Sequence, residues 1–210
     1  MKTSRAAKLT AILDDSSTGE REVHDHLKKN LEIVINAFAT SWNFAKAYAE
    51  VEFGSEYRAD FVVLCADSGS WTAHVVELKS PKARLYTTKG VKSRELLLVE
   101  RQLAQRLDWR QAFDSTFRES LAKRVSRDSI AQCSHADSHS RARAELRDPR
   151  TVIWFQAHAV IGRSSTLSAE ERELRRQDEL QGSWGSPRVL TFDRLIHCAR
   201  RLDGAAAHEA

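Results

Sequence analysis

Two carboxylates and a lysine lie in two short apolar segments, and these residue types can bind a divalent metal beside a phosphate. Asp60 lies in the run Tyr57–Leu64, and Glu77 and Lys79 lie toward the end of the run Ala73–Pro81. Carboxylate oxygens are hard ligands suited to Mg²⁺ or Mn²⁺, which keep part of their coordination shell for phosphate and water. A metal so held, with a lysine to orient or help deprotonate a water, can hydrolyse a phosphodiester.

Both segments are expected to be β-strands, because valine and aromatic residues dominate them and turn residues bound them. The polar residues between them favour an antiparallel hairpin that can bring Asp60 beside Glu77. Alternation along the second strand places Glu77 and Lys79 on one face and directs Val76 and Leu78 into a core. The main-chain carbonyl of Leu78 could complete the metal shell.

A structural reading of the same residues is also open. An aspartate on one strand and a Glu-x-Lys at the end of another are common on solvated sheet edges. The strongly apolar strand before Glu77, the hairpin partner carrying Asp60, and the stop at Ser80-Pro81 favour a catalytic group. From the residues alone, the two readings stay in balance.

The rest of the chain predicts one α/β domain with a mixed sheet. Its 210 residues, 41% of them hydrophobic and 30% charged, are enough for a real core in a soluble domain. Apolar spacing predicts helices and strands in the order helix, three strands, helix, strand, helix, strand, helix. The helices are expected near residues 18–38 (one helix or a broken pair), 93–117, 168–181 and 193–203, and the strands near 46–53, 57–64, 73–79, 151–163 and 187–191.

Three segments are expected outside this core. Residues 1–17 and 204–210 are polar or small and predict flexible ends, leaving 18–203 as the domain. Residues 126–149 are rich in Ser, Arg, Asp and His, and predict a polar surface insertion that is partly helical.

Composition restricts the cellular setting and the partners. No apolar stretch is long enough to span a membrane, and the first residues lack the apolar run of a signal peptide. Three well-separated cysteines suit a reducing compartment, so we expect a cytoplasmic protein with no membrane partner. A net charge of +4 is compatible with a nucleic-acid partner.

The arrangement Asp60…Glu77-Leu78-Lys79 resembles the PD-(D/E)xK nuclease superfamily, whose core is helix, three-stranded meander, helix, strand. More narrowly, the chain resembles the Shedu anti-phage nuclease domain over about residues 18–203. The segments that carry this resemblance are Gly19–Asn30, Arg58–Val62, Val76–Pro81, Glu100–Leu103, Val160–Arg163 and Val189–Leu195.

The resemblance implies a restriction-endonuclease-like core and metal-dependent cleavage of double-stranded DNA in bacterial defence, with Mg²⁺ or Mn²⁺ as cofactor. It implies a homo-oligomer, because related defence nucleases assemble. The metal ligands it implies are Asp60, Glu77, the Leu78 carbonyl and Glu20. The catalytic residues it implies are Asp60, Glu77, Lys79, Glu20 and Gln102.

A basic loop follows the motif and is expected to contact DNA phosphates through Lys82, Arg84, Lys89 and Lys92. The alternative for this loop is an ordinary solvated face. For the whole chain, the alternatives are a restriction or repair nuclease of the same fold, and a nucleic-acid-binding or scaffold module that does not cleave.

Overall fold

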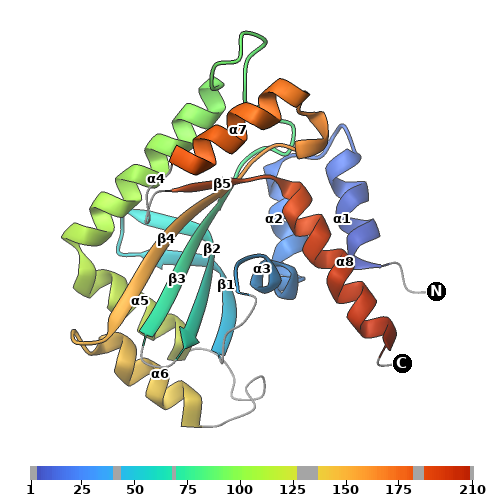
Figure 1. Ribbon diagram of the computed structural model, residues 1–210. Coiled ribbons are helices and arrows are strands. Elements are labelled where there is room, and N and C mark those ends of the chain that lie inside the picture. The colour runs from blue at the N-terminus through green and yellow to red at the C-terminus, as the bar shows by residue number, and fades with distance from the viewer. Residues whose placement is uncertain (1–3, 40–43, 68–69, 127–136, 182–186, 209–210) are drawn as a thin grey trace.

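A five-stranded mixed sheet forms the centre of the molecule (Figure 1). The computed structural model describes residues 4–39, 44–67, 70–126, 137–181 and 187–208. The strands lie in chain order, with β1, β2 and β3 antiparallel and with β4 and β5 parallel to β3. They are β1 Phe44–Phe53, β2 Tyr57–Asp67, β3 Ser70–Leu78, β4 Val152–Val160 and β5 Arg188–Leu190. The predicted α/β fold class with a mixed sheet is confirmed.

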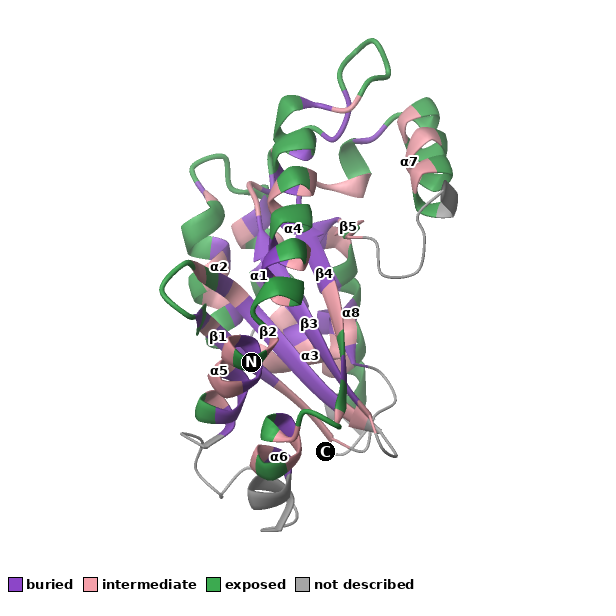
Figure 2. Cartoon of the chain, turned by 90° about the vertical axis from the view of Figure 1, so that its left-hand side faces the viewer, coloured by how far each residue is buried: buried purple, intermediate pink, exposed green. Residues whose placement is uncertain are grey.

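Helices cover both faces of this sheet, so the strands are largely buried (Figure 2). One face packs against α1 Arg5–Asp14, α2 Glu20–Lys28, α3 Leu31–Phe38 and α8 Phe192–His208. The other face packs against α4 Arg94–Ala112, α5 Asp114–Ser126 and α6 Asp137–Arg147, while α7 Ala169–Gln181 lies beyond β5. None of the described helices has the length and apolar character needed to cross a membrane.

Local sequence explains where the helices beside the site begin and end. The Ser93 hydroxyl accepts the Leu96 N–H at 3.1 Å and caps α4, and Val99 and Leu103 continue its buried stripe. The helix predicted over 93–117 is two helices, because α4 ends at Ala112 and α5 begins at Asp114. For residues 18–38 the sequence left one helix or a broken pair open, and the structure shows the pair as α2 and α3.

The expectation of a flexible N-terminal segment was wrong. Helix α1 has a cap at Ser4, and its Leu9 and Leu13 are buried in the core shared with α8. The Asp203 carboxylate accepts the N–H groups of Arg5 and Ala6 at 3.0 Å, which ties the two ends of the chain together. Apolar residues four apart supply the anchor that the polar composition concealed. The C-terminal boundary was also set too early, since α8 continues to His208.

Part of the segment 126–149 is held more firmly than a surface insertion would be. Helix α6 buries Ala142 and Leu146 in the core on the α4–α5 face of the sheet. The Trp71 Nε1–H donates to Glu145 at 2.9 Å. The predicted partial helix is therefore present, and two apolar side chains one turn apart are enough to dock it. Residues 127–136 lie outside the described part of the chain.

Strands β1 and β2 are kinked at one pair of positions. Ala47 and Ala49 pack on the α3 side of the sheet, whereas Val51 packs on the α5 side although its number has the same parity. The switch occurs at Glu50, which has a φ of 54°. The facing position on β2 is Asp60, and the regular pairing register omits this pair. The kink therefore directs Asp60 out of the normal strand alternation.

A histidine pair is buried on the face covered by α3 and α8. His74 Nδ1 lies 3.0 Å from His158 Nε2, and the Phe38 ring covers both imidazoles. Burial lowers the pKa of His74 to about 4 and that of His158 to about 3. Both residues are therefore neutral core groups at pH 7, away from the Asp60–Glu77 group.

Candidate active site at the kinked end of the sheet

Asp60 takes the place of a backbone acceptor where the β2–β3 ladder stops. The ladder ends at the pair Phe61↔Val76, one position before Asp60 and Glu77 would face each other. There the Leu78 N–H donates to Asp60 Oδ2 at 2.7 Å. Because the N–H and C=O of an extended residue point toward the same neighbouring strand, the Leu78 carbonyl also faces the Asp60 side. The predicted approach of Asp60 to Glu77 and Leu78 is thus present.

Glu77 is paired with an arginine from α4. Glu77 is only 3% exposed, and its Oε1 forms an ion pair with Nη1 of Arg106, itself 6% exposed. The Arg106 guanidinium also lies over the Tyr57 ring, with 5.9 Å between its Cζ and the ring centroid. Burial lowers the pKa of Arg106, and the nearby Asp60 carboxylate opposes this effect. Glu77 and Asp60 therefore share one buried cation.

Arg106 is a site residue that the sequence analysis did not single out. The signal that could have found it is its position, three residues after Leu103 and seven after Val99, on the apolar stripe of α4. A charge placed on a buried stripe requires a partner of opposite sign, and Glu77 was the available carboxylate.

Glu20, the first residue of α2, lies within electrostatic range of Lys79 and Asp60. Glu20 opens α2, and the His24 ring one turn later packs on Phe61, 5.0 Å between centroids, next to Asp60 in β2. Loss of hydration to the surrounding protein raises the pKa of the Glu20 carboxyl, with the Lys79 ammonium opposing the rise and the Asp60 carboxylate adding to it. Glu20, Lys79 and Asp60 are therefore close enough to interact electrostatically.

The backbone around Lys79 is fixed by the strand beside it. The Lys79 N–H donates to the Val160 carbonyl at 2.9 Å, and the Gly162 N–H donates to the Ser80 carbonyl at 3.1 Å. Gly162 has a φ of 61°, and a Cβ at this position would lie 2.5 Å from the Ala83 carbonyl oxygen. Only glycine fits there, so Gly162 is a positioning residue for the segment that carries Lys79.

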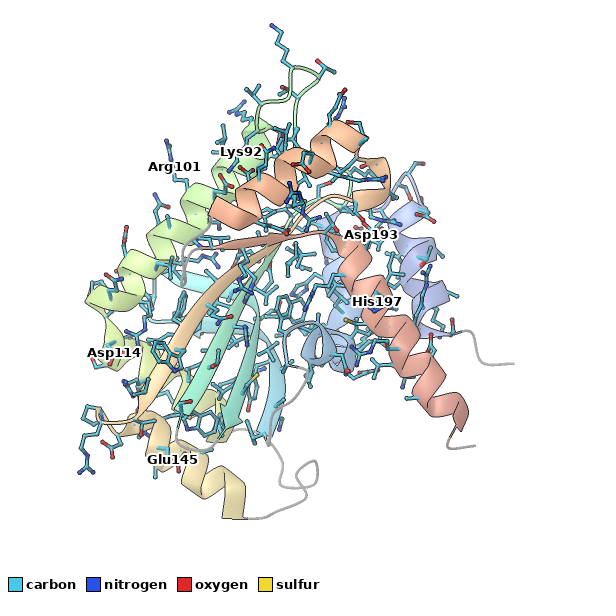
Figure 3. All side chains as sticks on the ribbon, in the orientation of Figure 1. Lys92, Arg101, Asp114, Glu145, Asp193 and His197 are labelled. Atoms are coloured by element: carbon cyan, nitrogen blue, oxygen red, sulfur yellow. The ribbon has the colours of Figure 1, made fainter. Side chains whose placement is uncertain are left out.

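Gln102 lies on α4 one turn before Arg106, at the half-buried edge of the apolar stripe. Within the described residues, no hydrogen bond joins it to Asp60, Glu77 or Lys79, and its role stays a prediction. Arg101 beside it points outward from α4, away from the sheet (Figure 3).

The four basic residues expected to contact DNA differ in their surroundings. Lys82, Arg84 and Lys89 are exposed on the segment that follows the motif. The Lys82 ammonium donates to the Ser16 carbonyl, and Arg84 lies 3.7 Å from Glu171.

Lys92 has two acidic partners instead. Its Nζ lies 2.8 Å from Glu100 and 3.4 Å from Asp178, and both carboxylates help raise its pKa against the opposing effect of burial. These residues and Tyr86 line a cavity of about 540 Å³ between α4, α7 and β5. Lys92 therefore links α4 to α7, which leaves it less available for phosphate than the other three.

The donor set at the kink fits a small hard cation. Asp60 and Glu77 supply two carboxylates and Leu78 a carbonyl, a combination typical of Mg²⁺ sites that use few protein oxygens. Among the described residues, no three His, Cys, Asp or Glu side chains come together as a metal-binding cluster. Ligation by Glu20 thus stays a prediction, and the fit depends on the two carboxylates.

The fold and the site define an α/β protein with an acidic group, a lysine and a buried arginine at the kinked end of a mixed sheet. The chain belongs to the family described as Shedu protein SduA, C-terminal, whose family model matches residues 17–196. This membership places it among Shedu-type antiviral defence proteins. A search of curated proteins found no match.

Proposed function

We propose that this chain is a metal-dependent endonuclease of the PD-(D/E)xK type that cleaves double-stranded DNA in Shedu-type defence. The observation that supports this most is the convergence of Asp60 and Glu77 where the β2–β3 ladder ends, with Lys79 directly after the strand. If the β2–β3 ladder continued to the end of the strands, a backbone carbonyl would accept the Leu78 N–H and no side-chain carboxylate would be required.

In this proposal Asp60, Glu77 and the Leu78 carbonyl would hold the ion. A bound Mg²⁺ or Mn²⁺ supplies positive charge for the phosphate and favours ionisation of a water. Lys79, whose backbone is fixed by Val160, would orient the attacking water and help to remove its proton. Attack in line would leave a 5′-phosphate and a 3′-hydroxyl.

Two further residues would assist at the edges of the site. The raised pKa of Glu20 makes it a better proton acceptor than an ordinary glutamate, so it can take part in the proton transfer from water. The amide of Gln102 would position water or phosphate from α4. Lys82, Arg84 and Lys89 would contact flanking phosphates, a role that follows from their exposure beside the motif.

The proposal is tested with plasmid DNA and Mg²⁺ or Mn²⁺, with and without chelator. Lys79→Ala should abolish cleavage while DNA binding stays close to that of the unmodified chain. Lys29→Ala is the matched control, because Lys29 is an exposed lysine at the end of α2. Full cleavage by Lys79→Ala, or cleavage that survives the chelator, would contradict the proposal.

One observation favours the alternative of a module that binds nucleic acid without cleaving it. A buried ion pair between Glu77 and Arg106 is also what a purely structural group would contain. DNA binding without nicking, across a range of metal concentrations, would support this alternative. If cleavage occurs, sedimentation analysis and the ratio of nicked to linear product test whether a homo-oligomer pairs two sites on one duplex.

A further inference from the structure

The site already contains a buried positive charge, the guanidinium of Arg106. Arg106 and Glu77 are both almost completely buried and form an ion pair, with Asp60 close enough to act on the guanidinium. The Tyr57 ring lies against the guanidinium. Any divalent cation that binds the Glu77 carboxylate must therefore bind beside the positive charge of Arg106.

We infer that Arg106 competes with the divalent cation for Glu77, and that this competition couples metal binding to phosphate binding. The inference rests on the proposed function, because it takes Asp60 and Glu77 as the metal ligands. In the metal-free protein, Arg106 neutralises Glu77. When the ion binds, the Glu77 carboxylate turns to the ion and the guanidinium is released toward the phosphate of bound DNA.

The physical argument is one of charge pairing at low dielectric. Separating a buried ion pair is costly unless each charge finds a new partner. A cation provides the partner for Glu77, and a phosphate provides a planar, bidentate partner for Arg106. Each ligand thus removes part of the cost of binding the other. By linkage, the effect of DNA on metal affinity must equal that of metal on DNA affinity.

The direct test is a calorimetric titration with Mn²⁺ at pH 8 in the absence of DNA. Arg106→Gln removes the competing charge and should tighten Mn²⁺ binding about tenfold or more, the size of effect that one nearby like charge exerts. Arg106→Lys keeps the charge and should bind Mn²⁺ close to the unmodified affinity. The matched control is Arg110→Gln, since Arg110 lies one turn along α4 and pairs with Asp114 outside the site at 2.8 Å.

A second measurement observes the unmodified chain and uses a variant only to assign a resonance. In the unmodified chain labelled with ¹⁵N-arginine, the Arg106 Nε resonance is identified by its loss in Arg106→Lys. Saturating Mg²⁺ should shift this resonance and leave that of Arg110 in place. An unshifted Arg106 signal, or a folded Arg106→Gln that binds Mn²⁺ no more tightly, would overturn the inference.

The outcomes also separate this inference from the proposed function. A chain that binds Mn²⁺ and cleaves DNA, but whose Arg106→Gln variant shows no gain in affinity, refutes the competition alone. A chain that binds no Mn²⁺ and cleaves no DNA refutes the endonuclease proposal, and the competition fails with it.

Discussion

Asp60 has two roles that can be separated by choice of substitution. Its Oδ2 accepts the Leu78 N–H at 2.7 Å, and Leu78 is buried, so this amide has no access to solvent. Asp60→Asn is isosteric and keeps an amide oxygen in place to accept this bond, but it removes the charge. Asp60→Ala removes both the acceptor and the charge.

The expected magnitudes follow from that single bond. An unsatisfied buried N–H costs about 1–3 kcal/mol, whereas a neutral hydrogen bond still contributes about 0.5–1.5 kcal/mol. Asp60→Ala should therefore be less stable than Asp60→Asn by about 1–3 kcal/mol. Both variants should lose DNA cleavage, because neither offers a carboxylate to a metal ion.

Urea denaturation followed by circular dichroism measures the stability difference, and the plasmid assay measures cleavage. The two transitions must have equal m-values for the comparison to hold. Equal stability of the two variants would show that the bond to Leu78 does not hold the end of β3. Cleavage by Asp60→Asn at the unmodified rate would remove Asp60 from the metal site.

Three further predictions concern other parts of the chain. Leu9→Ala should lower the free energy of unfolding by about 2–5 kcal/mol, because Leu9 on α1 is fully buried in the core. Chemical denaturation measures this change, and an unchanged free energy of unfolding would mean that α1 is not docked. His158→Gln should flatten the loss of stability between about pH 6.5 and pH 3. The lowered pKa of His158 keeps its ring neutral in the folded protein while the unfolded chain gains this proton, so its contribution to stability is complete above this range and falls with pH. Denaturation at several pH values tests this prediction, and an unchanged slope would contradict it. Joint replacement of the exposed residues Lys82, Arg84 and Lys89 should weaken DNA binding and reduce its dependence on salt concentration. Binding measured at several salt concentrations tests this, and it would be unchanged if these residues form only a solvated face.

The fold was predictable where periodicity is strong. The β2–β3 hairpin and strand β4 follow from local patterns of apolar residues, and the structure confirms both elements. The expectation that β4 is buried throughout was wrong, because Val152 and Trp154 in its first half are exposed. The break between α2 and α3 was one of two alternatives that the pattern left open. Helix α1 was missed because its composition is polar overall, although Leu9 and Leu13 are spaced for one buried face. Composition averages over a segment, whereas docking needs only the few side chains that reach the core.

The site was predictable in its residue types and only partly in its contacts. Strand pairing was enough to bring Asp60 near Glu77. No local pattern could show that Arg106, 29 positions after Glu77 in the chain, is its partner. That contact depends on how α4 crosses the sheet, which is a property of tertiary packing. The kink at Glu50 was also invisible, because a glutamate with positive φ has no signature in the sequence.

The kink links the stability of the sheet to the chemistry proposed for it. In a regular ladder at Glu50, Asp60 and Glu77, backbone N–H groups would donate to backbone carbonyls of the neighbouring strand, and the side chains would alternate strictly between the two faces. The break frees the Leu78 amide, which Asp60 then satisfies, and the Lys28–Glu50 ion pair ties α2 to the distorted strand. Because the Asp60 carboxylate both completes the sheet and faces the site, a substitution there changes structure and function together unless it keeps the acceptor. Isosteric replacements are therefore the informative ones at this end of the sheet.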